Sequence, residues 1–246
     1  MNALTAFSGR NTKELLRDPL NLVFGLGFPV VLLLLMNAIQ RSIPVALFQL
    51  ERLTPGIAVF GLSFIALFSA TLISKDRSTA FLLRLFASPM RAADYILGYT
   101  LPLLPMALAQ VLICYAVAGV LGLRLTANVL LALAVSLPTA ALFIGIGLLC
   151  GSLLNDKQVG GVCGALLTNL SAWLSGAWFD LALVGGAIQK IAYALPFVHA
   201  VEAGRAAVSG DYAAIMPHLW WVIGYAALTL AAAVLAFRRK MLRDNA

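Results

Sequence analysis

Charged residues are scarce in this 246-residue sequence. Asp, Glu, Lys and Arg make up 11% of it and apolar residues 62%, whereas a soluble domain carries about 25% charged residues. Apolar stretches of about 20 residues, the length that crosses a hydrocarbon core of roughly 30 Å, recur along the chain. The composition therefore excludes a soluble core. It predicts an all-α membrane protein, because lipid does not tolerate unpaired backbone groups.

Cysteines are few and form no pattern. Cys114, Cys150 and Cys163 are odd in number, lie in apolar stretches and lack metal-ligand spacing. They are predicted to be free thiols, with no disulfide and no metal site. The first nineteen residues also lack the apolar run and small-residue cleavage site of a secretory signal, so we expect them to be retained.

Six apolar stretches predict six spans, an even number that places both termini on one side of the membrane. If the termini face inward, the inner segments hold 12 Lys and Arg residues and the outer segments hold 5, which agrees with the positive-inside rule. The formal net charge of +7 therefore indicates orientation and not nucleic-acid binding. The predicted spans are about 20–39, 55–73, 95–121, 129–153, 159–178 and 219–237.

The sequence outside these spans predicts three parts: an interfacial amphipathic helix at 1–19, the transmembrane domain at 20–238 and a basic cytoplasmic tail at 239–246. Asn11 and Glu14 have the spacing of a capping box, which places a helix start at Asn11. Residues 181–195 are too short for a span and are interrupted by Gly185 and Gly186. We expect short re-entrant helices there, before the last span.

The predicted spans contain no charged residue. Buried Asp, Glu, Arg or His usually mark ion and proton pathways, so their absence argues against an ion-coupled transporter. No G-x-x-x-x-G-K-[ST] phosphate loop is present either, and the energy for uphill transport would have to come from a partner. The spacings Gly147-xxx-Gly151 and Gly160-xxx-Gly164 favour close helix packing.

A basic segment between the second and third spans, 74–99, keeps apolar side chains among its charges. This mixture indicates a surface on which another protein docks. The bases are Lys75, Arg77, Arg84 and Arg91, and the apolar residues are Phe81, Leu82, Leu85 and Phe86.

One enzymatic alternative is an intramembrane serine protease, which has six spans, a serine in G-x-S-G and a histidine on a later helix. Ser175-Gly176 and His199 fit this pattern in part. Trp173 stands at the first glycine position, however, and both groups lie toward the outer end, so the sequence does not support a nucleophile with its base. A membrane anchor without transport of its own is a further alternative.

Four stretches together resemble the permease subunits of ABC-2 type ATP-binding-cassette exporters, including drug and antibiotic exporters. They are Arg17-Asp18-Pro19 before a span with Phe28-Pro29, Thr54-Pro55-Gly56 at the second span, Arg84–Pro89 with Ile96-Leu97-Gly98 after it, and Leu195-Pro196-Phe197 through Ala203-Gly204-Arg205. Asp76 lies near the acidic position that leads into the family's Arg-Leu element, while Ala80 and Leu83 replace its usual Gly and Glu.

The resemblance implies a working unit in the inner cell membrane. It would contain two permease subunits, as a homodimer or with a homologue, and two copies of a cytoplasmic ABC ATPase that binds ATP and Mg²⁺. The chain itself would hold no cofactor and would contact membrane lipid but not nucleic acid. The implied ATPase-coupling residues are Phe81, Leu82, Arg84, Leu85, Phe86, Ala87, Ser88, Pro89, Asp156 and Lys157.

The uncharged spans and the family's habits favour export of a hydrophobic or amphipathic cargo, such as a drug, an antibiotic or a lipid-like molecule. Export of a polysaccharide or lipid-linked glycan is the alternative within transport. The residues expected to line the path, which equally fit plain helix packing, are Phe24, Phe28, Phe60, Phe64, Phe68, Gln110 and Asn169.

Overall fold

The computed structural model describes residues 3–43, 46–79, 81 and 90–244, and within these ranges it contains helices and no strand. The elements are α1 Ala3–Leu16, α2 Pro19–Leu22, the π-helical η1 Val23–Gly27, α3 Phe28–Ser42, the 3₁₀ turn η2 Ala46–Phe48, α4 Leu50–Ser78, α6 Ala92–Leu121, α7 Ala127–Leu153, α8 Asp156–Val159, the π-helical η3 Gly160–Leu167, α9 Thr168–Leu174, α10 Leu181–Val184, α11 Gly186–Ala194, α12 Pro196–Ser209 and α13 Tyr212–Asp244. The predicted all-α membrane fold is confirmed.

Five helical segments of the described residues are long and apolar enough to cross a membrane. They are Val23–Ser42, Leu50–Ser78, Ala92–Leu121, Ala127–Leu153 and Tyr212–Lys240. The predicted span at 159–178 corresponds to α8, η3 and α9, which follow one another without a break from Asp156 to Leu174. A wider π-helical stretch in its middle divides this helix, and it ends four residues before the predicted limit.

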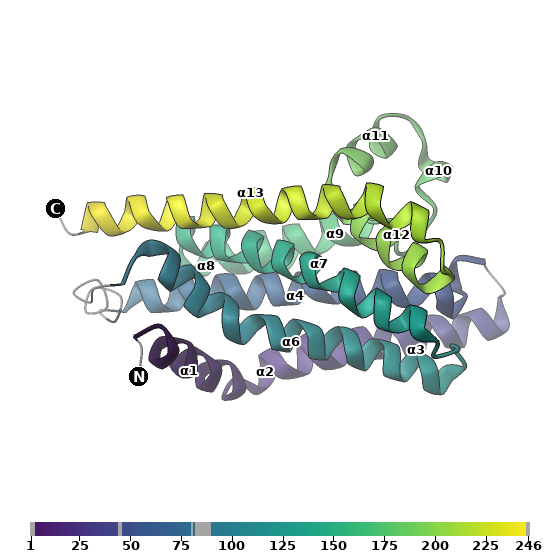
Figure 1. Ribbon diagram of the computed structural model, residues 1–246, viewed down its shortest axis with the longest axis horizontal. Coiled ribbons are helices and arrows are strands. Elements are labelled where there is room, and N and C mark those ends of the chain that lie inside the picture. The colour runs from purple at the N-terminus through teal and green to yellow at the C-terminus, as the bar shows by residue number, and fades with distance from the viewer. Residues whose placement is uncertain (1–2, 44–45, 80, 82–89, 245–246) are drawn as a thin grey trace.

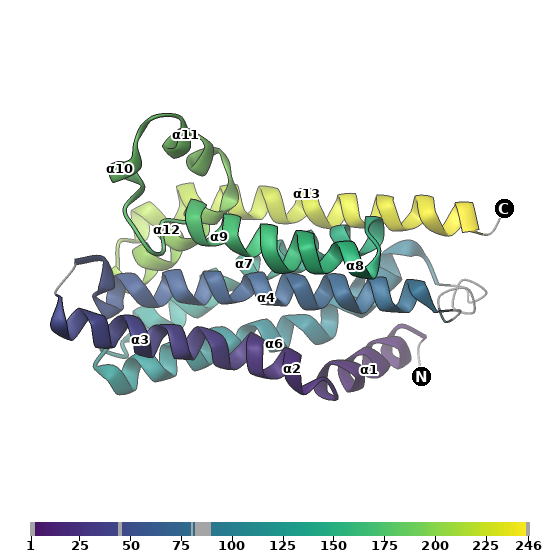
Figure 2. The same cartoon turned by 180° about the vertical axis from the view of Figure 1, so that it is seen from behind.

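The long helices lie side by side along the long axis of the molecule (Figure 1). Both termini, the end of α4 and the start of α6 lie at one end of this bundle, which we call the terminal end (Figure 1). The opposite end, called the distal end, carries α10, α11 and α12. Seen from behind, α4 runs between α3 and the α8–α9 segment (Figure 2), and it is buried along most of its length.

Several helices extend past the apolar runs that predict the spans. Helix α4 begins at Leu50 and continues to Ser78, beyond the predicted span at 55–73. Helix α6 begins at Ala92, three residues before the predicted span at 95–121. The segment predicted as one loop at 74–99 is therefore helical at both ends. Two short helices do occupy 181–195, as predicted, whereas the buried helix α12 after them was missed.

The capping box at Asn11 is also wrong. Helix α1 begins at Ala3 and passes through Asn11, which is fully buried. The Asn11 side chain donates through Nδ2 to the carbonyl of Gly98, at 3.1 Å. A tertiary hydrogen bond to α6 thus replaces the local cap. Phe7 and Leu15 are buried on the same side.

Helices α4 and α7 approach closely at one of the two predicted glycine spacings. A Cβ on Gly147 would overlap the Ala66 carbonyl and the Ser69 hydroxyl, and one on Gly151 would overlap the Ala70 backbone. Gly160, in contrast, has no atom of the described residues within 4 Å of such a Cβ. Small residues that allow backbones to touch are a main source of helix association in lipid.

We predict that Gly147→Ala separates α4 from α7 and lowers the free energy of unfolding by about 1–3 kcal/mol, as overpacking usually does. Thermal unfolding of the detergent-purified chain measures this loss. The matched control is Gly224→Ala on α13, where a Cβ meets no described atom within 4 Å and alanine is the better helix former. Equal losses in the two variants would contradict the close approach.

Candidate functional site

The predicted coupling residues fall into two groups. Phe81, Asp156 and Lys157 are described, and Asp156 and Lys157 are both exposed at the start of α8. The others lie outside the described residues: Leu82, Arg84, Leu85, Phe86, Ala87, Ser88 and Pro89. What the structure does describe is the frame that carries this segment, namely the last turn of α4 and the helices around it.

Asp76, in the last turn of α4, is the centre of that frame. Its carboxylate is buried, and Oδ2 accepts hydrogen bonds from Arg10 Nη1 at 2.6 Å and from the hydroxyl of Tyr99 at 2.9 Å. Because Arg10 lies on α1 and Tyr99 on α6, one carboxylate joins three helices. A buried carboxylate requires such partners, since an unpaired buried charge is strongly unfavourable.

Arg10 is held on more than one side. Its Nη1 also donates to Asn11 Oδ1 at 3.0 Å, and its guanidinium lies 4.3 Å above the ring of Phe81, a cation–π contact. Partial burial lowers the pKa of Arg10, but the hydrogen bond and charge of Asp76, together with the charges of Glu14 and Tyr99, outweigh it, so the pKa lies above its ordinary value. Phe81, the first predicted coupling residue, is thus connected to Asp76 through Arg10.

Shape complementarity fixes α1 on α6 beside this pair. The ring of Phe7 fills the space that a side chain on Gly98 would occupy. It meets the rings of Tyr95 and Tyr99 edge-on, with centroid distances of 5.7 and 4.9 Å, a favourable aromatic geometry.

A second set of contacts connects α4 to α7 and α8. The hydroxyl of Ser74 donates to Asp156 Oδ1 at 2.5 Å. Arg77 Nη1 donates to the carbonyls of Gly151 and Leu154 at 2.6 and 3.1 Å, and so satisfies acceptors that the end of α7 leaves without helical donors. The last turn of α4 is therefore held by α1 and α6 on one side and by α7 and α8 on the other.

Sequence reasoning missed Asp76 as the centre of this frame, although it noted the residue near the family's acidic position. A usable signal was present. Asp76 lies one helical turn after Leu72, on the same side of the helix, and stands between the bases Lys75 and Arg77.

The residues predicted to line a substrate path are only partly gathered. Phe24, Phe28, Phe60 and Phe64 form a continuous row of ring contacts between η1–α3 and α4, with centroid distances of 5.4–6.4 Å. Trp178 extends the row from Phe60 at 5.3 Å. Phe24, at the end nearer α2, is 48% exposed, so the row reaches the surface of the chain.

The other three predicted residues lie apart from this row. Phe68 is buried one turn further along α4, against Gly25, and Asn169 is exposed, with its Nδ2 donating to Ala165 of its own helix. Gln110 is fully buried between α3, α4 and α6; its Nε2 donates to Cys114 Sγ at 3.4 Å, and its Oε1 has no partner among the described residues.

Two of the motif stretches meet at the distal end. Gly204 packs against the ring of Pro55, and the neighbouring Arg205 donates to the carbonyls of Arg52 at 3.1 Å and Gly176 at 2.9 Å. Its Nη1 pairs with Glu202 at 2.7 Å. A single guanidinium thus holds α12, the start of α4 and the turn after α9 together.

The geometry of Ser175 and His199 does not fit a protease. The Ser175 hydroxyl bonds to the Ala172 carbonyl at 3.4 Å, within its own turn. Both ring nitrogens of His199 are engaged elsewhere, Nδ1 with His218 Nδ1 at 2.8 Å and Nε2 with the Tyr193 carbonyl at 2.9 Å. In the described residues, His199 therefore has no nitrogen left to act as a base for Ser175.

The described residues thus form a bundle of apolar helices with polar junctions at both ends, and Ser175 and His199 are not brought together as nucleophile and base. The family model of the ABC-2 type transporter matches residues 2–208. The chain therefore belongs to the ABC-2 type transporter family and is a multi-pass permease component of an ABC transporter, a family that pairs with ABC ATPase subunits. A search of curated proteins gives no match.

We predict that Asp76→Asn lowers the free energy of unfolding by about 1.5–3 kcal/mol, the usual contribution of a hydrogen bond to a charged group. The substitution keeps the shape of the side chain and removes its charge. The control is Glu14→Gln, which weakens an exposed 3.8 Å pair with the same Arg10 and should change stability by less than about 1 kcal/mol. Thermal unfolding in detergent distinguishes the two, and equal effects would contradict the central place of Asp76.

Proposed function

We propose that the terminal end faces the cytoplasm and that the segment 81–89, called the docking segment, docks on an ABC ATPase. The observation that carries this proposal is the last turn of α4, held by Asp76 on one side and by Ser74 and Arg77 on the other. A segment that leaves a turn held in this way can transmit force to the bundle. The positive-inside distribution of Lys and Arg supports the same orientation.

In this proposal the working unit contains two ATPase subunits, which bind ATP and Mg²⁺, and two permease copies. Closure of the ATPase pair would shift the equilibrium between two packings of the bundle, since a ligand can drive a conformational change only through its differential affinity for the two states. Arg10 stacks on Phe81 and bonds to Asp76, so a displacement that starts at the docking segment reaches α1, α4 and α6 directly.

The proposed cargo is hydrophobic or amphipathic and is exported. The support is the row of rings between η1–α3 and α4, which begins at the half-exposed Phe24. Trp178, in the turn after α9, extends this row from Phe60. Contacts of this kind are apolar and contribute about 0.5–1.5 kcal/mol per ring pair beyond area burial, so a ring-bearing or alkyl cargo can replace them without leaving a charge unpaired.

We predict that Arg84→Glu combined with Leu85→Asp abolishes co-purification of the ATPase, because the double change reverses one charge and places another in an apolar contact. Arg124→Glu combined with Leu125→Asp is a matched control, since the same dipeptide lies in the exposed link between α6 and α7 at the distal end. Pull-down from detergent-solubilised membranes measures the effect. Retention of the ATPase by the first variant, or its loss from both, would refute the docking segment.

We also predict that cells lacking this chain become more sensitive to a panel of apolar and amphipathic drugs, and that the wild-type chain restores growth. The Arg84→Glu, Leu85→Asp variant should fail to restore it, while the Arg124→Glu, Leu125→Asp control should succeed. Growth inhibition across the panel is the measurement. Unchanged sensitivity together with altered surface glycan would favour the polysaccharide alternative instead.

A further inference from the structure

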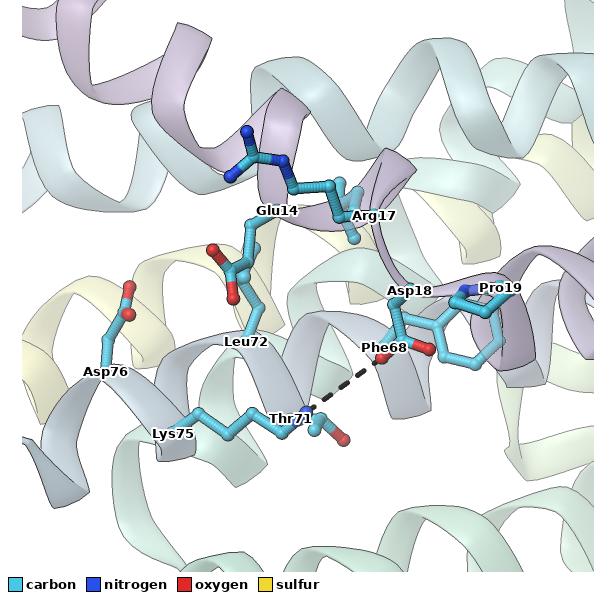
Figure 3. A pocket seen from close by; sticks show the side chains of 10 residues that line it. Glu14, Arg17, Asp18, Pro19, Phe68, Thr71, Leu72, Lys75 and Asp76 are labelled. Carbon is cyan, nitrogen blue, oxygen red and sulfur yellow. Dashed lines mark ion pairs between the residues drawn. The ribbon is translucent and has the colours of Figure 1, made fainter.

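A half-open cavity of about 250 Å³ lies at the terminal end, between the α1–α2 junction and α4 (Figure 3). Its lining includes Asp76 but none of the rings in the aromatic row and no residue of the docking segment. Its lining consists of Glu14, Leu15, Arg17, Asp18, Pro19, Phe68, Thr71, Leu72, Lys75 and Asp76. The volume is below the 300–1,000 Å³ typical of pockets for drug-sized ligands, so the cavity suits a small polar group.

Charges of both signs line this cavity and nearly cancel. Three carboxylates and two cations contribute −1 in total, and Arg10, which is bonded to Asp76, brings the sum to zero. The pair between Lys75 Nζ and Asp18 Oδ2 is 3.9 Å long (Figure 3), too long for a hydrogen bond. The Lys75 ammonium, which is about half exposed, is therefore not held by a hydrogen bond to Asp18 and can meet an anionic group in the cavity.

The cavity also lies where the chain passes from apolar to charged surface. Along α4, Leu72 is followed one turn later by Lys75 and Asp76, and on the other wall Pro19 leads into η1. Just past this wall, Val23 and Phe24 are exposed. Charged walls at the membrane interface that continue into exposed apolar surface match an amphiphile with a polar head and acyl chains.

We propose that this cavity binds the headgroup of a phospholipid with a primary ammonium, that is, phosphoethanolamine. Arg17 and Lys75 meet its phosphate, and the carboxylates of Glu14 and Asp18 accept hydrogen bonds from its ammonium. Ionised carboxylates only accept hydrogen bonds, so a quaternary choline, which has no N–H, is a poorer ligand. The absence of net charge disfavours a purely anionic headgroup. The proposal requires membrane insertion and does not depend on coupling to an ATPase.

The test uses the full chain in mild detergent with phosphatidylethanolamine, phosphatidylcholine or phosphatidylglycerol of identical acyl chains. Native mass spectrometry counts retained lipid, and thermal unfolding measures stabilisation. We expect phosphatidylethanolamine to be retained preferentially and to raise the unfolding temperature most. Inorganic phosphate at millimolar concentration should have no effect, and if it stabilises the chain as well as the lipid does, the cavity is a simple anion site and the proposal fails.

Two variants separate the two halves of the headgroup. Arg17→Ala combined with Lys75→Ala should weaken retention of phosphatidylethanolamine about tenfold or more, because charge-assisted hydrogen bonds to phosphate are lost. The matched control removes two exposed bases at the distal end, Arg124→Ala with Lys190→Ala, and should bind normally. Glu14→Gln combined with Asp18→Asn should lose the preference for phosphatidylethanolamine over phosphatidylcholine and gain affinity for phosphatidylglycerol.

The Glu14→Gln, Asp18→Asn variant keeps side-chain shape and so stays informative if the double alanine variant does not fold. Equal retention of the three lipids by the wild-type chain, or an unchanged preference in this variant, would overturn the proposal. Neither measurement involves the ATPase, so failure here is distinguishable from failure of the docking segment.

Discussion

The arrangement of the terminal end depends on the burial of a single carboxylate. Asp76 is placed in the apolar bundle by the length of α4, and a charge there is tolerated only when it is paired and hydrogen-bonded. Arg10 and Tyr99 provide these partners from two other helices. The packing of α1 against α4 and α6 follows from that requirement, and so does the contact between the Arg10 guanidinium and the ring of Phe81.

The rest of the bundle is held by a different kind of contact. Between helices in lipid there is little hydrophobic driving force, so close packing of small residues has to replace it. Gly147 and Gly151 bring the α7 backbone onto α4, and Gly204 receives Pro55 at the distal end. The molecule therefore has a polar, specifically bonded terminal end and a close-packed middle. At the distal end, Arg205 and the His199–His218 pair form further polar junctions.

This division explains what the sequence could predict. Length and hydropathy reveal the spans because the bilayer imposes both, and the glycine spacing on α7 was visible for the same reason. Pairings between distant residues leave no such trace: Arg10 is 66 residues from Asp76, and Asn11 is 87 residues from Gly98. The capping-box prediction at Asn11 was wrong because the spacing of Asn11 and Glu14 suggests a helix start, whereas the Asn11 side chain bonds to the carbonyl of Gly98 on α6. All the coupling roles stay predictions, both those of Phe81, Asp156 and Lys157 and those of the residues outside the described ranges.

The two kinds of contact also differ in how easily they separate. Parting two edge-to-face rings between α3 and α4 costs about 0.5–1.5 kcal/mol beyond the area exposed, whereas losing a hydrogen bond to the buried Asp76 carboxylate costs about 1.5–3 kcal/mol. Any rearrangement that keeps Asp76 paired must move α1, the last turn of α4 and the start of α6 as one body. The contacts of the Phe28 ring on α3 with the Phe60 and Phe64 rings on α4 can change while Asp76 stays paired. Because Asp76 holds the helices of the terminal end together, conformational change is favoured at the row of aromatic rings, where the proposed cargo would enter.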